Sequence, residues 1–557
     1  MEAALLKIYR SFQSGTVKQK ELAELLELSV KQTSRLLHRW EKEGWLNYTP
    51  GKGRGVQSSL SWLRNIEEYY EGEMQAKLKN ESVEEAAKYL NFDWSAGAKQ
   101  RLTKIFQSRF GYEQDGTDKL IIPKRHPFIT INPIEAADAY SANLVSNLYN
   151  RLVHVDANGD VTSEIAHSWE QANGRLRLYL RKDIQFHDGS ILTAKDVVNC
   201  LNKLRKHPTY QKIWAPVEAI VSPAPLVVEL HTTCSYCLQL LGLISASIFK
   251  ETKNQLYGTG AFFLEKSSPS ITILKAFSEY FQERPLLDTV EFVTVPKDFD
   301  KIYRSSQTTV STDTIDVQSD SGFGIVILNI CHESAIQNKA LRQFIHHIIA
   351  RHREEIVDLN QYHHNYSPNH NGFLIGHSKP YTITEVVCPK VEKPLVIEYV
   401  NYTKDLTIWL KNLLEHEGIP VELRYVTFQD QLNNRCLTNK ADIIIHGEIF
   451  ELNQQLSFFQ FMTSDNSAAS DVVHAHPLIT DLIQKYVETP FEEWTNLNLQ
   501  IERKCIDESI LIPLYYEKRI IPFSTDIQNV TIKHFGYVDF SKLWMKPLNT
   551  EKGCLTL

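Results

Sequence analysis

The sequence lacks the hydrophobic segments that direct proteins into or across membranes. Its 557 residues contain no run of about eighteen apolar residues, so no transmembrane helix is predicted. The first residues, MEAALLKIYRSF, carry Glu2 early and lack the unbroken apolar core and small-residue cleavage site of a secretory signal. We therefore expect a cytoplasmic protein with no membrane partner.

Cysteine is also sparse, with eight residues scattered along the chain, which argues against a disulfide framework. Cys234 and Cys237 form one C-x-x-C motif, which suits a redox pair, half of a zinc site, or two small buried residues. No second C-x-x-C and no ordered Cys/His pair follows at zinc spacing. The structural role is therefore favoured, and neither a metal nor a cofactor is predicted.

Common catalytic signatures are missing as well. We find no Walker loop, no G-x-S-x-G and no zinc-binding helix, and GTGAFF at 258–263 lacks the third glycine and the acidic residue of a dinucleotide site. The sequence therefore predicts a protein that is not an enzyme.

Length and charge indicate several domains with different partners. At about 100–200 residues per domain, the chain has room for three or four structural units. Residues 1–64 contain eleven Lys/Arg and six Glu, a balance of +5, whereas the whole chain carries −7. The remaining residues therefore sum to −12, and a polyanion is the expected partner of the N-terminal segment alone.

Hydrophobic periodicity predicts three helices in this segment. Apolar residues at three- and four-residue steps indicate one helix ending near Gly15, and TVKQKELAELLELS indicates a second that breaks at Glu27 to Ser29. Ser29 suits the N-cap of a third helix, VKQTSRLLHRWEKEG, which ends at Gly44.

The third helix has the layout of a DNA-recognition helix. A 100° step places Val30, Thr33, Leu36, Leu37 and Trp40 inward and the cations outward. Its N-terminal half would enter the major groove, where Arg, Lys and Gln read base edges, while later cations meet phosphates. The predicted DNA-contacting residues are Lys31, Gln32, Arg35, His38, Arg39 and Lys42.

Two strand-like segments follow, WLNYTP and VQSSLSWL, joined by the glycine-rich loop GKGRG at 51–55. Three helices and a basic hairpin together make a winged helix. Glycines let the loop lie close to DNA, so we expect Lys52 and Arg54 to contact phosphates. Double-stranded DNA is therefore the predicted partner.

Beyond the hairpin, residues 65–118 read as charged helices, and the rest alternates strands with helices in an α/β organisation. Several segments resemble the family 5 solute-binding proteins, which bind peptides and related solutes: LYNRLV at 148–153, IAHSWE at 165–170, FHDGSILTAKDVV at 186–198 and GTGAFFL at 258–264. The resemblance covers essentially all of 119–545 and implies a two-lobed clamp, of the type II periplasmic-binding-protein class, that closes on a ligand.

One segment departs from that family where its peptide binders carry W-x-A-D-Y-x-D-P. In IIIHGEIFEL, Glu448 takes the place of the first aspartate, while Gly447 and Leu452 replace the alanine and proline. A carboxylate persists, so the resemblance implies a ligand near Glu448 without fixing peptide specificity; the alternative is an exposed surface glutamate.

A winged helix followed by a family 5 domain resembles the SgrR-type transcriptional regulators. The predicted domains are 1–64 (winged helix), 65–118 (helical extension) and 119–557 (solute-binding-like), with lobe I at 119–295 plus 505–557 and lobe II at 325–504. The resemblance implies that the second part senses a sugar phosphate, an oligopeptide or a related solute. The alternative is a cytoplasmic transport-associated protein without a regulatory role, and the sequence does not decide between monomer and homodimer.

Overall fold

The computed structural model describes residues 1–51, 57–81, 83–107, 110–114, 116–124, 127–253, 255–295, 314–362, 366–383, 386–433, 436, 439–524, 527–531 and 538–545. The chain forms two compact units. The first contains Met1–Pro127, Leu264–Lys275 and Leu287–Thr314; the second contains Phe128–Phe263, Ala276–Leu286 and Ile315–Leu557. None of the described helices is both long and apolar enough to cross a membrane.

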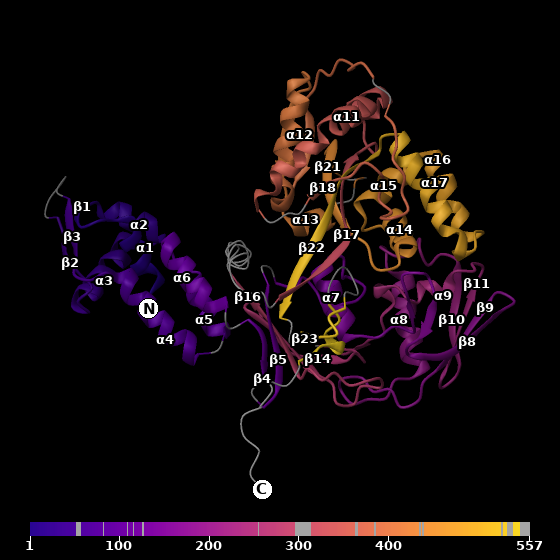
Figure 1. The fold of residues 1–557 in the computed structure, drawn as a ribbon, viewed down its shortest axis with the longest axis horizontal. Coiled ribbons are helices and arrows are strands. Elements are labelled where there is room, and N and C mark those ends of the chain that lie inside the picture. Colours follow the sequence, from indigo (N-terminus) through magenta and orange to yellow (C-terminus); the bar gives the residue numbers. More distant parts are fainter. Residues whose placement is uncertain are drawn as a thin grey trace, which may run out of the picture. The chain divides into compact units, whose positions relative to one another are not determined.

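The first unit begins with a winged helix (Figure 1). Helices α1 (Ala3–Ser11), α2 (Gln19–Leu26) and α3 (Val30–Lys42) precede strands β2 (Leu46–Thr49) and β3 (Ser58–Trp62). Strand β1 (Gly15–Val17) adds to β3, giving the antiparallel order β1-β3-β2. The first helix therefore ends earlier than predicted, because pairing with the distant β3 draws residues 15–17 into an extended strand.

Helices α4 (Ile66–Asn80), α5 (Val83–Leu90) and α6 (Ala96–Gln107) continue the same hydrophobic core. Trp40 of α3, Met74 of α4 and Leu102 of α6 are all fully buried within it.

The same core reaches a five-stranded sheet in the first unit. Its order is β14-β15-β16-β5-β4, formed by β14 (Phe262–Ser267), β15 (Ile271–Ala276), β16 (Thr289–Thr294), β5 (Asp118–Lys124) and β4 (Gly111–Gln114). Glu84 of α5 pairs with Lys266 at 2.7 Å and accepts a hydrogen bond from Ser270 at 2.7 Å, so the helices are also held to the sheet by polar contacts. The predicted domain boundaries, 1–64, 65–118 and 119–557, are not tested by these contacts and stay predictions.

The second unit contains two lobes. The first lobe has a four-stranded sheet of order β10-β11-β9-β8, made of β10 (Val217–Ala224), β11 (Val227–Thr232), β9 (Arg175–Leu180) and β8 (Ala166–Ala172). The same lobe contains helices α7 (Ala139–Leu148), α8 (Ala194–Lys206) and α9 (Cys237–Leu240) and the short hairpin of β6 (Val153–Val155) and β7 (Val161–Ser163).

The second lobe has a six-stranded sheet of order β18-β22-β17-β21-β19-β20 (Figure 1). Its strands are β18 (Tyr366–Pro368), β22 (Leu511–Ser524), β17 (Thr314–Leu328), β21 (Ile443–Ile449), β19 (Leu395–Tyr399) and β20 (Val421–Tyr425). Residues 505–557 were predicted to belong to lobe I, but strand β22, which lies within that range, pairs with strands of the second lobe.

The two faces of this sheet are covered by different helices. Because side chains alternate along a strand, Val326 and Leu328 of β17 pack in the core with α11 (Lys339–His352) and α12 (Lys404–His416), whereas Phe323 contacts Phe461 of α14 (Gln454–Thr463). Helices α15 (Ala468–His474), α16 (Pro477–Gln484) and α17 (Trp494–Asp507) follow α14 in the chain. The two faces of the sheet therefore pack against different helices.

Candidate DNA-binding and ligand-binding sites

Helix α3 is held firmly at its start and along its inner face. Ser29 and Gln32 form a capping box: the Gln32 backbone N–H donates to Ser29 Oγ at 3.3 Å, and the Ser29 N–H donates to Gln32 Oε1 at 3.0 Å. Thr33, Leu37 and Trp40 are buried beneath the helix. Val30 was predicted to lie inward but is 45% exposed, because it occupies the first helical position, beyond the reach of the core.

The predicted DNA-contacting residues divide into two groups. Lys31, Arg35 and Lys42 are exposed, and no hydrogen bond or ion pair joins them to another described residue. Gln32 is also exposed, but its amide oxygen serves the cap. The first three side chains can therefore reach a polyanion without breaking an internal contact.

Arg39 and His38 already have partners within the winged helix. Arg39 Nη2 donates to Glu2 Oε2 at 2.5 Å, and the same oxygen accepts from Trp40 Nε1 at 3.1 Å. His38 Nδ1 lies 3.3 Å from Glu41 Oε2, while Glu41 Oε1 accepts from the Tyr48 N–H at 2.9 Å. These contacts attach α3 to the chain start and to β2, a role that helical spacing alone could not indicate.

Lys52 and Arg54 lie outside the described residues. The hairpin that carries them is closed at its base, where Ser58 Oγ accepts hydrogen bonds from the Tyr48 hydroxyl at 3.1 Å and from the Gly51 N–H at 3.2 Å. Their predicted phosphate contacts stay predictions.

Glu448 lies on β21 in the second lobe, opposite Phe323 of β17. Its side chain is 30% exposed, and Oε2 is 3.1 Å from His446 Nε2. The neighbouring Gly447 faces two tyrosines, since an added Cβ would lie 3.4 Å from the Tyr515 hydroxyl and 3.6 Å from the Tyr402 ring. Because side chains alternate along a strand, these tyrosines lie on the face of the sheet opposite to the Glu448 side chain. The Glu448 carboxylate is partly exposed to solvent, and it could bind an amine or a hydroxyl group.

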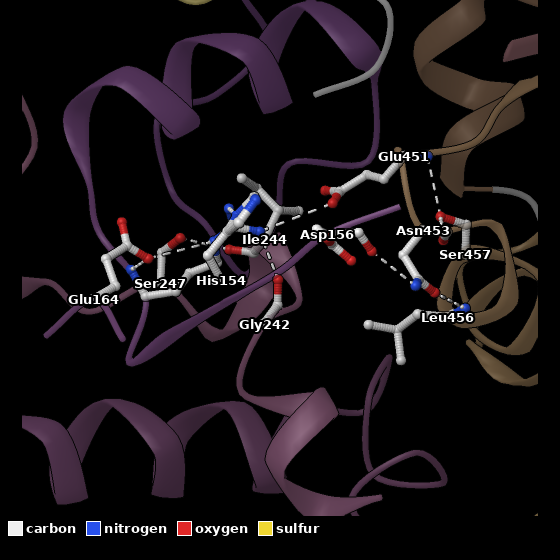
Figure 2. A network of polar contacts seen from close by, with 11 residues as sticks. His154, Asp156, Glu164, Gly242, Ile244, Ser247, Glu451, Asn453, Leu456 and Ser457 are labelled. Carbon is white, nitrogen blue, oxygen red and sulfur yellow. Dashed lines mark hydrogen bonds and ion pairs between the residues drawn. The ribbon is translucent and has the colours of Figure 1, made fainter. Parts of the chain in front are cut away.

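The two lobes of the second unit contact each other through Arg151, which is buried. Its Nη1 donates to the Gly242 carbonyl at 2.5 Å and lies 3.8 Å from Glu451 Oε2 of the other lobe, while Nε is 4.0 Å from Glu164. Figure 2 shows the Glu451 side chain extending from the second lobe toward the first-lobe residues around Gly242. The arginine therefore lies between two carboxylates, one from each lobe.

A second link lies close by (Figure 2): Asn453 Nδ2 donates to the Asp156 carbonyl at 3.0 Å. Asn453 also caps α14, because its Oδ1 accepts from the Leu456 N–H at 2.9 Å. The start of one helix is thereby fixed to the opposite lobe.

A polar cavity of about 230 Å³ lies beside Arg151 in the first lobe. Amide, hydroxyl and charged groups line it, among them Asn143, Asn147, His154, Glu164, Tyr280 and Lys542. Such a lining can hydrogen-bond a small polar solute. Among the described residues, no group of three or more His, Cys, Asp or Glu could hold a metal ion.

Two family models match the chain. Residues 4–113 match the N-terminal region of the sugar transport-related sRNA regulator family, and residues 160–349 match the family 5 bacterial extracellular solute-binding proteins. The order of the two matches agrees with the order of the winged helix and the lobes.

Similarity to whole proteins extends almost from end to end. An HTH-type transcriptional regulator SgrR from Photorhabdus laumondii is 24% identical over 548 residues, covering 95% of each chain. One from Yersinia enterocolitica is 22% identical over 561 residues, again covering 95% of each. The uncharacterized protein YhjP of Bacillus subtilis is 23% identical and covers 94% of this chain and 95% of its own.

Solved structures resemble the larger part of the molecule. The periplasmic binding protein DppA from Helicobacter pylori, in complex with the peptide STSA, has a TM-score of 0.65 at 14% identity, covering 77% of this chain and 98% of its own. The oligopeptide-binding protein AppA of Bacillus subtilis, with a nonapeptide, has a TM-score of 0.64 at 16% identity, covering 77% and 99%. These likenesses concern the fold alone.

The predicted fold class, a winged helix followed by a two-lobed solute-binding-like part, is confirmed by both family matches and by these structures. The chain is therefore similar from end to end to the SgrR-type transcriptional regulators, and it combines a match to the N-terminal region of that family with a match to the family 5 solute-binding proteins.

Proposed function

We propose that the protein is a ligand-responsive transcriptional regulator whose winged helix binds operator DNA. The observation that carries the proposal is the exposed row of Lys31, Arg35 and Lys42 on a capped and well-packed helix. The end-to-end similarity to proteins named transcriptional regulators supports it.

In this proposal α3 enters the major groove by its N-terminal half. Lys31 and Arg35 then lie nearest the base edges, with Gln32 beside them, while Lys42 meets a phosphate. His38 and Arg39 act mainly by holding α3 in place, and they contact DNA only at the edge of the interface. Lys52 and Arg54 add phosphate contacts from the hairpin loop. A homodimer would place two such helices on paired half-sites.

The solute-binding part is the proposed sensor. A sugar phosphate, an oligopeptide or a related solute would bind between the lobes near Glu448, with the polar cavity beside Arg151 as a second candidate location. A ligand biases DNA binding only by its differential affinity for the two states, typically about 1–3 kcal/mol.

The proposed regulator acts in the cytoplasm and carries out no covalent chemistry on its ligand. The alternative is a cytoplasmic transport-associated protein without a regulatory role, which would not use the cations of α3. Turnover of peptides or sugar phosphates by the purified chain would refute the non-enzymatic part of the proposal.

The test is selection of genomic fragments by the full chain, using DNA from the organism that encodes it. Discrete enriched fragments are expected, with binding that weakens steeply as salt rises because counterions are released. Recovery of random fragments only would overturn operator recognition. Native mass spectrometry of the freshly purified chain tests the sensor separately, since a retained small mass identifies the solute class.

A further inference from the structure

The C-x-x-C motif has a position in the fold that the proposed function does not use. Cys234, Ser235, Tyr236 and Cys237 join strand β11 to helix α9 in the first lobe. Cys234 is 3% exposed and Cys237 is 0% exposed, and both are free thiols. A zinc half-site would need a second pair of ligands, and no described group of three or more His, Cys, Asp or Glu supplies it.

The two thiols are placed as a reactive pair. They lie three positions apart in one buried turn, and Thr232 Oγ1 lies 3.3 Å from Cys234 Sγ while accepting from the Cys234 N–H at 3.2 Å. Interaction with the Cys237 thiol lowers the pKa of the Cys234 thiol to about 7, against the opposing effect of burial, and the pKa of Cys237 is raised. Cys234 is therefore the attacking thiolate at neutral pH, and Cys237 is the resolving thiol.

The backbone around the pair lies at the surface. Thr233 and Ser235, on either side of Cys234, are exposed, so a small opening of the turn uncovers the sulfur. Tyr236, between the two cysteines, points the other way and is only 2% exposed. One side of the turn, at Thr233 and Ser235, is therefore exposed to solvent, and the other side, at Tyr236, is buried.

Tyr236 is buried against the second lobe. Its ring centroid lies 5.6 Å from that of Phe459 on α14 and 4.8 Å from that of Trp494 on α17. Phe459 and Trp494 also contact the ring of Tyr486, at 4.7 Å and 4.6 Å. The residue enclosed by the two cysteines is therefore a member of an aromatic cluster otherwise built by the opposite lobe.

We propose that Cys234 and Cys237 are a redox site, oxidised to a disulfide by a low-molecular-weight disulfide such as glutathione disulfide, and that this oxidation loosens the contact between the lobes at Tyr236. The inference concerns the second unit alone and does not depend on DNA binding.

The reaction balances with two thiols and one external disulfide. The Cys234 thiolate attacks one sulfur of the external disulfide, forming a mixed disulfide and releasing one thiolate. Cys237 then loses its proton and attacks the Cys234 sulfur, which releases the second thiolate. The protein loses two hydrogens, and the external disulfide is reduced to two thiols.

The structural effect follows from the change in sulfur spacing. The two sulfur atoms are not bonded in this structure, and they must approach to about 2.05 Å in a disulfide. The turn has to contract, and in a close-packed interface the ring between the two cysteines cannot keep all its contacts. Tyr236 therefore moves relative to Phe459 and Trp494.

The experiment treats the full folded chain with glutathione disulfide and measures intact mass, disulfide location and hydrogen exchange. The wild type is expected to lose about 2 Da, with the bond mapped to Cys234 and Cys237. Amides in α14 (Gln454–Thr463) and α17 (Trp494–Asp507) should then exchange several-fold faster.

Two variants and a control make the outcome decisive. Cys237→Ala should stop at the mixed disulfide on Cys234, whereas Cys436→Ala, which removes another buried cysteine, should behave like wild type. Tyr236→Leu should reproduce the faster exchange without oxidation. Absence of the disulfide in the folded wild type, under treatment that oxidises the urea-unfolded chain, would overturn the redox site; a disulfide with unchanged exchange would overturn its effect on the lobes.

Discussion

Lys212 Nζ lies 2.6 Å from Asp465 Oδ1, and this ion pair joins the two lobes of the second unit. The backbone reinforces it, because the Asp465 N–H donates to the Thr209 carbonyl at 3.0 Å. Asp465 is largely buried, whereas Lys212 is partly exposed. Together with Arg151, Asn453 and Tyr236, the pair holds the lobes in direct contact.

We predict that Lys212→Ala loosens this contact. Losing the ammonium group leaves the Asp465 carboxylate with less compensation, at an expected cost of about 1 kcal/mol, so the Asp465 amide should exchange roughly fivefold faster. Lys203→Ala is the matched control, since it removes a cation paired with Glu251 inside the first lobe. Equal protection in the two variants would mean that the ion pair does not hold the lobes together.

Arg35 and Arg39 are predicted to act differently although both lie on α3. Arg35→Ala should weaken operator binding by about 1–3 kcal/mol and leave stability within about 0.5 kcal/mol. Arg39→Ala removes the exposed pair with Glu2 and should destabilise the winged helix by up to about 1 kcal/mol, with a smaller effect on DNA. Fluorescence anisotropy with labelled DNA and thermal denaturation separate the two. The reverse pattern would assign base contact to Arg39.

Glu448→Gln should weaken binding of an amine-bearing solute by about 1.5–3 kcal/mol, because a charge-assisted hydrogen bond is lost while the shape is kept. The measurement is equilibrium dialysis with a labelled solute identified by native mass spectrometry. Glu422→Gln, on the exposed edge strand β20, is the control. Unchanged affinity in the Glu448 variant would remove this carboxylate from the site.

We predict that the free energy of unfolding decreases as the pH falls, because the buried His346 is protonated less readily in the folded chain than in the unfolded chain. Burial, followed by repulsion from Arg353, lowers the pKa of His346 to about 3, and its Nδ1 lies 3.1 Å from Ser509 Oγ. The unfolded chain binds the proton near pH 6.5 and the folded chain does not, so stability is full above pH 6.5 and decreases toward pH 3.

The slope from this one group is at most about 1.4 kcal/mol per pH unit. Urea denaturation across pH 4–7 should show a shallower slope for His346→Gln, while His416→Gln, an exposed histidine, leaves it unchanged. If His346→Gln does not change the slope, the folded chain protonates His346 as readily as the unfolded chain does, which would contradict the prediction.

Much of the winged helix could be predicted from sequence because its signals are local. The capping residue Ser29, the break at Glu27 and the inner residues Thr33, Leu37 and Trp40 all depend on neighbours within one or two turns. Val30 was misplaced because periodicity gives a direction but not the extent of the core. Strand β1 was missed since its partner, β3, lies about 40 residues away.

The contacts between lobes were not predictable for the same reason. Lys212 and Asp465 are ordinary surface residue types separated by 253 positions, and no periodicity relates them. The Arg39 and Glu2 pair is likewise set by tertiary packing. The C-x-x-C motif could be noticed in the sequence, but only the fold shows that Tyr236 within it packs against the opposite lobe.

The most direct test of the central claim is the affinity of the full chain for one selected genomic fragment, measured from low to moderate salt for wild type, Arg35→Ala and Lys88→Ala. Both variants lose one positive charge, but Lys88 lies on α5 and pairs with Glu85. The proposed function predicts that Arg35→Ala alone weakens specific binding, by about 1–3 kcal/mol. Equal effects of the two variants, or no fragment bound above random DNA, would contradict recognition of an operator by α3.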